Sequence, residues 1–218
     1  MSAVLPRGFY DRDTITVARD LLGKVIVREM EGRRLSVKIV ETEAYVGPQD
    51  KACHASRGMT PRNQVMFGEP GHAYIYFIYG MYYCLNLVTE KVGYPAAVLI
   101  RAGEPVEGED VMRTLRKKAK NREDLTSGPG KLCQAMGIGR DLNGADVCRR
   151  GPLYLEDAAG ESFEIVSSKR IGVDYAGEYK DKPYRFYIKD NPGVSITDEK
   201  AQKLKSYPKK RPKSSSPV

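Results

Sequence analysis

The sequence LSVKIVETEAY occupies residues 35–45 and combines a strand pattern with two acidic side chains. Side chains two residues apart share one face of a β-strand. The face expected to be buried carries Leu35, Val37, Ile39, Glu41, Glu43 and Tyr45. A carboxylate on a buried face is costly unless it is paired or functional. Glu41 and Glu43 are therefore either ion-paired with an arginine, such as Arg101, or part of a site that uses a carboxylate as a general base.

The segments on either side predict further strands and a few helices. A helix is expected from Asp13 to Gly23, because an aspartate suits its start and a glycine its end. Strand patterns occupy residues 24–30, 34–45, 73–88 as a hairpin around Gly80, 96–101, 154–166 and 184–188, and two more helices follow Glu107 and Ser127. The strands lack the regular helical crossovers of a parallel sheet. We therefore expect an α+β fold: a single domain with a curved, mainly antiparallel sheet, peripheral helices and a protruding aromatic β-hairpin.

Composition narrows the class of protein. A length of 218 residues suits one domain, and no apolar run is long enough for a membrane span. The N-terminus has no secretory pattern, so we expect the protein to stay inside the cell. The four cysteines form no Cys-x-x-Cys pair, which favours reduced thiols and argues against zinc.

Positive charge is concentrated near the C-terminus. The net charge is +8, and residues 203–213 contribute six lysines and arginines without an acid. Pro and Ser enrichment predicts that residues 203–218 form a basic, disordered tail beyond a domain of residues 1–202. The rest of the chain carries only about +2, which is weak evidence for a polyanionic partner. A second basic cluster, residues 113–122, is compatible with a solvated helix face.

Several side chains could serve a binding site. His54 lies in a long irregular segment, residues 47–71, of a kind that is more often functional than decorative. A surface histidine with ordinary partners is the alternative, and Cys53 beside it lacks further ligands for a metal.

Two loop features suggest contact with nucleic acid. Tyr79 precedes Gly80 at the expected tip of the aromatic hairpin, where an apolar side chain could act as a wedge in a base stack. The other tyrosines nearby are expected to be ordinary strand and core aromatics. The turn SGPGK, residues 127–131, could bind a phosphate at a helix start, although a simple helix cap explains it equally well.

Taken together, these motifs resemble the alkyladenine (3-methyladenine) DNA glycosylase family. The resemblance extends over nearly the whole chain. It rests on VETEAY (40–45) with Gly47, Pro48 and His54, TPRN (60–63), YFIYGMY (76–82) with Cys84 and Asn86, LIR (99–101), SGPGKLCQ (127–134), RIGV (170–173) and KPYRF (182–186). The basic tail is not part of this family pattern.

The resemblance implies a role for each matched residue. Glu43 would activate the attacking water, and Arg101 would help hold that water and Glu43. Tyr45, Tyr76 and His54 would bind the damaged base, Asn86 would disfavour normal guanine, and Tyr79 would intercalate. Met66 would lie beside the hairpin at the DNA surface, and Lys131 would contact the DNA backbone.

The implied activity is monofunctional release of alkylated or deaminated purines, such as 3-methyladenine, 7-methylguanine, hypoxanthine and ethenoadenine. The substrate would be double-stranded DNA, bound by a monomer without a cofactor, metal or membrane. The expected location is cytoplasmic and nucleoid-associated in a prokaryote, or nuclear in a eukaryote. Two alternatives remain open: a non-catalytic nucleic-acid binding module with the same hairpin, and a hydrolase of small nucleosides with the same acid.

Overall fold

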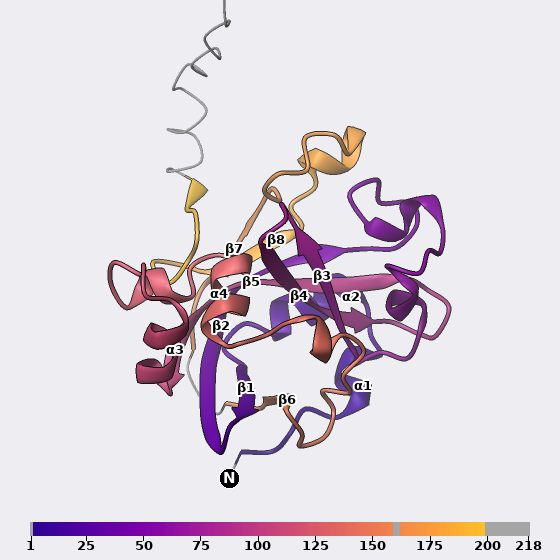
Figure 1. Cartoon of the computed structure of the whole chain (residues 1–218). Helices are drawn as coiled ribbons and strands as arrows, with labels where there is room; N and C mark the ends of the chain where they lie inside the picture. Colours follow the sequence, from indigo (N-terminus) through magenta and orange to yellow (C-terminus); the bar gives the residue numbers. More distant parts are fainter. Residues whose placement is uncertain (1, 159–161, 199–218) are drawn as a thin grey trace, which may run out of the picture.

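The computed structural model describes residues 2–158 and 162–198. Its sheet contains eight strands, all antiparallel to their neighbours. The strands are β1 (Val25–Met30), β2 (Arg33–Tyr45), β3 (Ala73–Ile78), β4 (Tyr82–Thr89), β5 (Ala96–Glu107), β6 (Leu153–Glu156), β7 (Ile165–Ser168) and β8 (Arg185–Ile188). Figure 1 shows the sheet at the centre, with the helices around it. The expected α+β class with a mainly antiparallel sheet is confirmed.

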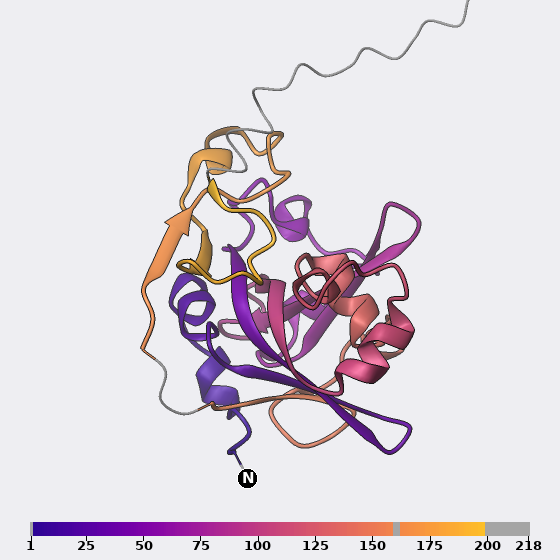
Figure 2. The same ribbon diagram turned by 90° about the vertical axis from the view of Figure 1, so that its left-hand side faces the viewer.

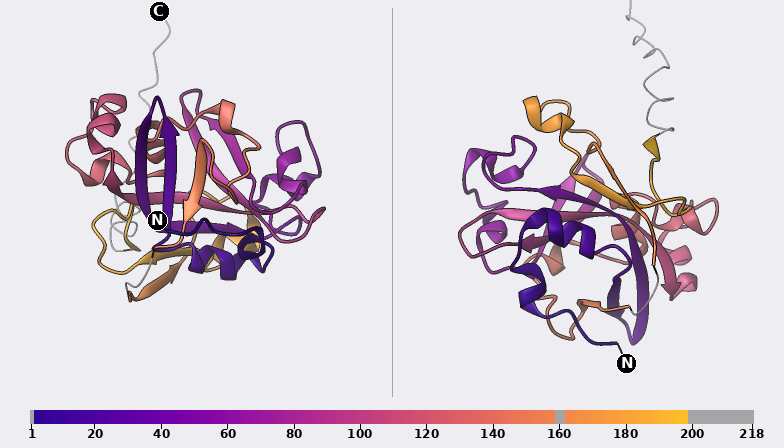
Figure 3. Two further views of the ribbon diagram at one scale, coloured as in Figure 1. Left: turned by 90° about the horizontal axis from the view of Figure 1, so that it is seen from below. Right: turned by 180° about the vertical axis from the view of Figure 1, so that it is seen from behind.

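Strand β2 is the central element of this sheet. The strand order along the main part of the sheet is β3-β4-β5-β2-β1-β6. Strand β8 also pairs with β2, and β7 pairs with β8. One edge of β2 pairs with β5, while the other pairs first with β1 through residues 33–38 and then with β8 through residues 41–43. The left panel of Figure 3 shows β6 beside β1. A strand that is paired on both edges holds its side chains in fixed positions, which suits a site built on it.

The simple alternation expected for β2 does not continue to its end. The pairing with β5 is irregular between Ile39 and Thr42, so the strand contains bulges just before Glu43. Residues 39–44 are all buried, on both faces. The expectation that one face alone is buried is therefore wrong for this half of β2, because helices and loops cover both sides of the sheet.

Within the described residues, four α-helices pack around the sheet: α1 (Arg7–Tyr10), α2 (Thr14–Asp20), α3 (Glu109–Leu115) and α4 (Pro129–Ala135). The Asp13 side chain caps α2 by accepting from the backbone N–H of Thr16. The Thr42 hydroxyl of β2 donates to the carbonyl of Ala18 in α2. Figure 3 (right) shows α1 and α2 in front of the sheet, whereas Figure 1 shows α4 in front from the opposite side. The helices thus cover both faces, and none in the described residues is long and apolar enough to cross a membrane.

The β3–β4 hairpin extends from the body of the protein, as Figure 2 shows. Its turn uses two left-handed residues, Tyr79 (φ 54°) and Gly80 (φ 68°). Tyr79 is 82% exposed and Met81 65% exposed. An apolar, exposed tip is therefore confirmed at the predicted position.

The later part of the chain differs from its expected boundaries. The pattern predicted as one strand region, residues 154–166, overlaps two separate strands, β6 and β7. Strand β6 pairs with β1 at the end of the main part of the sheet, whereas β7 pairs with β8. The buried strand expected at 96–101 continues to Glu107, because β2 pairs with it between residues 97 and 107. The predicted tail, residues 203–218, lies outside the described residues.

Candidate active site

A cavity of about 350 Å³ opens between the β3–β4 hairpin, the loop after β2, the start of α4 and the segment after Arg170. Its walls include Tyr45, His54, Met66, Tyr76, Tyr79, Asn86, Leu99, Arg101, Ile171 and Tyr175. Most of the predicted site residues therefore meet at one place, although they are spread over residues 45–101 of the chain. The volume suits a nucleobase-sized ligand.

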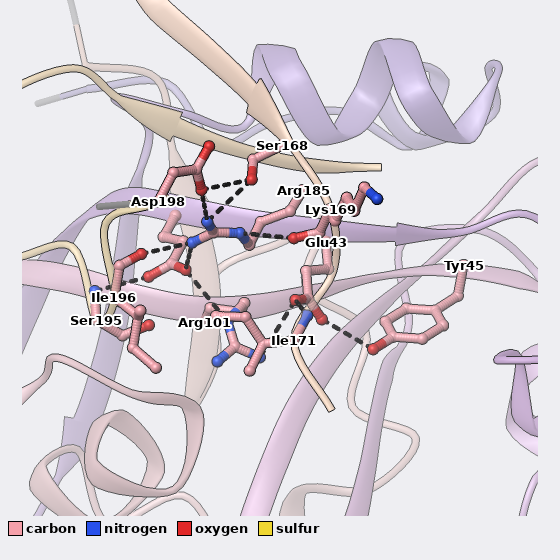
Figure 4. A network of polar contacts seen from close by, with 11 residues as sticks. Glu43, Tyr45, Arg101, Ser168, Lys169, Ile171, Arg185, Ser195, Ile196 and Asp198 are labelled. Atoms are coloured by element: carbon pink, nitrogen blue, oxygen red, sulfur yellow. Dashed lines mark hydrogen bonds and ion pairs between the residues drawn. The ribbon is translucent and has the colours of Figure 1, made fainter. Parts of the chain in front are cut away.

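Glu43 lies directly behind the cavity wall and is fully buried. Its Oε2 accepts from the Tyr45 hydroxyl (2.8 Å), and its Oε1 accepts from the backbone N–H of Ile171 (2.8 Å). Arg101 Nη1 lies 3.3 Å from the same Oε1. Figure 4 shows the bonds from Tyr45 and Ile171 to Glu43. The three groups that hold Glu43 all line the cavity, so the carboxylate lies directly behind groups that a ligand there would contact.

Arg101 connects both buried glutamates of β2. Its Nε donates to Glu41 Oε1 (3.2 Å), while Nη1 lies near Glu43. Burial alone would disfavour the guanidinium charge, but the carboxylates of Glu43 and Glu41 outweigh it and raise the pKa of Arg101. Both glutamates are therefore ion-paired with Arg101, as one alternative expected. They differ in their other partners: those of Glu43 line the cavity, whereas Arg185 and Ser195, which bind Glu41, do not.

His54 and Tyr76 form an aromatic wall of the cavity. Their ring centroids are 4.4 Å apart, with the planes at 74°. His54 Nδ1 lies 2.9 Å from the Tyr74 hydroxyl. Desolvation by these neighbours, together with the charge of Arg62, lowers the pKa of His54 to about 4. A neutral imidazole at physiological pH suits contact with a positively charged base.

The depressed His54 pKa predicts a pH effect that NMR can measure. His54 is one of two histidines, so comparison with His72→Gln assigns its ring resonance. We expect a titration midpoint near 4 rather than the usual value of 6.5. Unfolding then takes up a proton between these pH values, so this contribution to stability is present above pH 6.5 and is lost as the pH falls towards 4. A midpoint above 6 would contradict the described ring environment.

Asn86 and Met66 line the cavity from β4 and from the loop after β2. Asn86 is buried and donates through Nδ2 to the Tyr74 carbonyl (3.0 Å), which fixes its amide. Met66 is only 2% exposed and lies in the cavity wall. The short helical turn Gln64–Phe67 directs Met66 inward, into the apolar cluster that also contains Tyr74. Its contact with DNA remains a prediction.

Lys131 and the three arginines of the basic segment 113–122 form ion pairs with acidic side chains. Lys131 Nζ contacts Asp124, so a phosphate contact would have to replace this ion pair. Arg113 and Arg122 both bind Glu109 at the start of α3. These contacts favour the interpretation of a solvated helix face over a strongly cationic patch.

The structure adds residues that the sequence motifs did not single out. Arg170 binds Asp50 through two ion-pair contacts of 2.5 and 2.9 Å, and its guanidinium lies 4.8 Å from the centroid of the Tyr45 ring. Tyr175 is 69% exposed at the cavity mouth. The matched segment RIGV contained Arg170 and Ile171. No spacing rule in the sequence indicates, however, that the backbone N–H of Ile171 binds Glu43.

Comparisons with known proteins identify the family of this chain. Relatives provisionally named 3-methyladenine DNA glycosylases include one from Methanocella arvoryzae, 66% identical over 192 residues, which cover 88% of this chain and 96% of the relative. Relatives with the same name from Clostridium acetobutylicum and Desulfitobacterium hafniense are 54% and 50% identical, again over 88% of this chain, and over 97% and 98% of their own lengths. The sequence pattern of methylpurine-DNA glycosylases matches residues 8–192. This chain therefore belongs to the methylpurine-DNA glycosylase family.

Proposed function

We propose that this DNA glycosylase binds damaged double-stranded DNA as a monomer, flips an alkylated or deaminated purine into the cavity, and hydrolyses its N-glycosidic bond with water activated by Glu43. The observation that carries the proposal is the position of Glu43. Its carboxylate is held by Tyr45, Arg101 and the Ile171 N–H, and all three line the base-sized cavity. The product would be an abasic site, with the DNA strand left intact.

The chemistry follows from a carboxylate beside a departing base. A purine alkylated at N3 or N7 carries positive charge and leaves readily, so the protein must mainly place water on the opposite face of the sugar. Glu43 would accept the proton of that water, and its charge would stabilise an oxocarbenium-like sugar. The reaction parallels glycoside hydrolysis by direct displacement.

The aromatic walls would select the base. Tyr45 and Tyr76 would stack on it, and the neutral His54 would contact its edge. Asn86, fixed by its bond to the Tyr74 carbonyl, would oppose the 2-amino group of normal guanine. A rigid amide cannot turn away, so steric exclusion is effective here.

The test of the proposed function is a panel of defined duplexes. Wild-type protein is incubated with duplexes that contain hypoxanthine, ethenoadenine or 7-methylguanine, and abasic sites are quantified after alkaline cleavage. We expect base release from at least one lesion and strand breaks only after alkali. If no damaged purine is released, the assignment is wrong, and duplex binding without an abasic product would favour a non-catalytic binding module.

Tyr79→Ala should separate a duplex enzyme from a nucleoside hydrolase. The exposed ring would fill the gap left by the flipped nucleotide, and flipping costs a few kcal/mol. We therefore expect a loss of about 10- to 100-fold in single-turnover rate on the duplex. Turnover of a free nucleoside that is fast and indifferent to Tyr79→Ala would favour the nucleoside hydrolase instead.

A further inference from the structure

Glu41 is the second buried carboxylate of β2, and it is bound from three sides. Its Oε1 accepts from Arg101 Nε (3.2 Å) and from Arg185 Nη1 (2.9 Å), and its Oε2 accepts from the backbone N–H of Ser195 (2.8 Å). Glu41 is fully buried and is not among the residues that line the cavity. Charge-assisted bonds from two arginines, together with a bond from a backbone N–H, hold the Glu41 carboxylate in a single orientation.

Arg185 of β8 is the anchor of this arrangement. A guanidinium has five N–H donors, and those of Arg185 have five acceptors in the structure. They are Glu41 Oε1, Asp198 Oδ1, the Ser168 hydroxyl and the carbonyls of Lys169 and Ile196. Figure 4 shows these bonds converging on one planar group. Arg185 is 1% exposed, so it cannot turn without losing several bonds at once.

Arg101 is held by this anchored carboxylate on one edge only. Glu41 binds Nε, and Glu43 lies beside Nη1. Within residues 2–158 and 162–198, no further hydrogen-bond or ion-pair partner of this guanidinium is found. Because Arg101 lines the cavity, its remaining N–H groups are available to a ligand there.

We propose that Glu41 is a positioning residue for Arg101 and that Arg185 holds Glu41 in place. Glu41 fixes the Nε edge of Arg101 and so turns the Nη edge towards Glu43 and the cavity. Without Arg185, Glu41 could attract both edges of Arg101 and draw the guanidinium away from Glu43. The inference rests on the proposed function, because it assigns Arg101 to the reacting site.

The same contacts also connect β2, β5 and β8 to residues 195–198, so a purely structural role must be distinguished. A structural role predicts that loss of Glu41 lowers stability and affects the rate independently of Arg101. A positioning role predicts that the effect on the rate passes through Arg101 and disappears when Arg101 is absent. A double-mutant cycle separates the two cases.

The experiment compares Glu41→Gln, Arg101→Gln and the double variant in single-turnover base release from the best lesion duplex of the panel. We expect Glu41→Gln alone to lower the rate by about 10-fold while the Kd for the duplex stays within about twofold. In the Arg101→Gln background, Glu41→Gln should change the rate by less than about twofold.

Glu156→Gln is the matched control. Glu156 of β6 is also buried and also binds two arginines, Arg34 (2.8 Å) and Arg150 (3.3 Å), but it is not part of the cavity wall. Its rate should stay within about twofold of wild type even if its stability falls. If Glu41→Gln does not fold, Arg185→Lys replaces it in the cycle, because lysine keeps the charge without the five-donor geometry.

Each outcome decides a separate question. Equal rate losses from Glu41→Gln with and without Arg101 would overturn the positioning role, as would a wild-type rate in Glu41→Gln. If the positioning role fails in either way, base release by wild type and slow release by Arg101→Gln would still support the proposed function. Absence of base release by wild type would instead refute the proposed function itself.

Discussion

Glu43→Gln is expected to lower the single-turnover rate of base release by about 100- to 10,000-fold, the usual contribution of a general base. Glutamine has nearly the same shape, so its carbonyl can still accept from the Ile171 N–H that now binds Glu43 Oε1. It cannot accept the proton of water or stabilise a cationic sugar by charge. The measurement is single-turnover release of hypoxanthine or 7-methylguanine from a duplex, with the Kd for the same duplex determined separately.

Two features make the Glu43→Gln result decisive. The Kd should change little, because Glu43 does not itself line the cavity, so a rate loss would report on chemistry. The control Glu156→Gln removes a buried carboxylate outside the cavity wall and should leave the rate near wild type. A Glu43→Gln rate within about threefold of wild type would show that another group activates the water.

Asp50→Ala is expected to lower the free energy of unfolding by about 3–5 kcal/mol, the cost of leaving a buried charge without its partner. The side chains of Asp50 and Arg170 are both fully buried, and they form two contacts, of 2.5 and 2.9 Å. Base release should slow as well, because Arg170 packs behind the Tyr45 ring. Urea unfolding followed by far-UV circular dichroism measures the change.

Companion variants test the physical reason for this loss. Asp50→Ala with Arg170→Met removes both charges and should be less destabilising than Asp50→Ala alone. Asp20→Ala breaks the exposed pair with Arg12 and should cost no more than about 1 kcal/mol. The carbonyls of Ala44 and Tyr179 also accept hydrogen bonds from Arg170. If Asp50→Ala were no more destabilising than Asp20→Ala, these two carbonyls would be sufficient to stabilise the buried charge of Arg170.

The hairpin tip and the strand with two glutamates were predictable because their signals are local. Gly80 after Tyr79 marks a turn, and the alternation in residues 35–39 marks a strand, whatever the rest of the chain does. The inward position of Met66 was not predictable, because a single methionine in an irregular loop has no periodicity to follow. The difference between Glu41 and Glu43 was also hidden, since both occupy equivalent places in the strand pattern.

The sequence by itself determined the antiparallel sheet, the exposed aromatic tip and the presence of acids on β2, because backbone periodicity and turn chemistry act over a few residues. Only the tertiary structure decided which acid is bound by Arg185 and which lies at the cavity wall. That choice depends on contacts across more than a hundred residues: Arg185 and Ser195 reach Glu41, and the Ile171 N–H reaches Glu43. Long-range pairing of this kind leaves no repeat in the chain, so it becomes visible only after the strands have assembled.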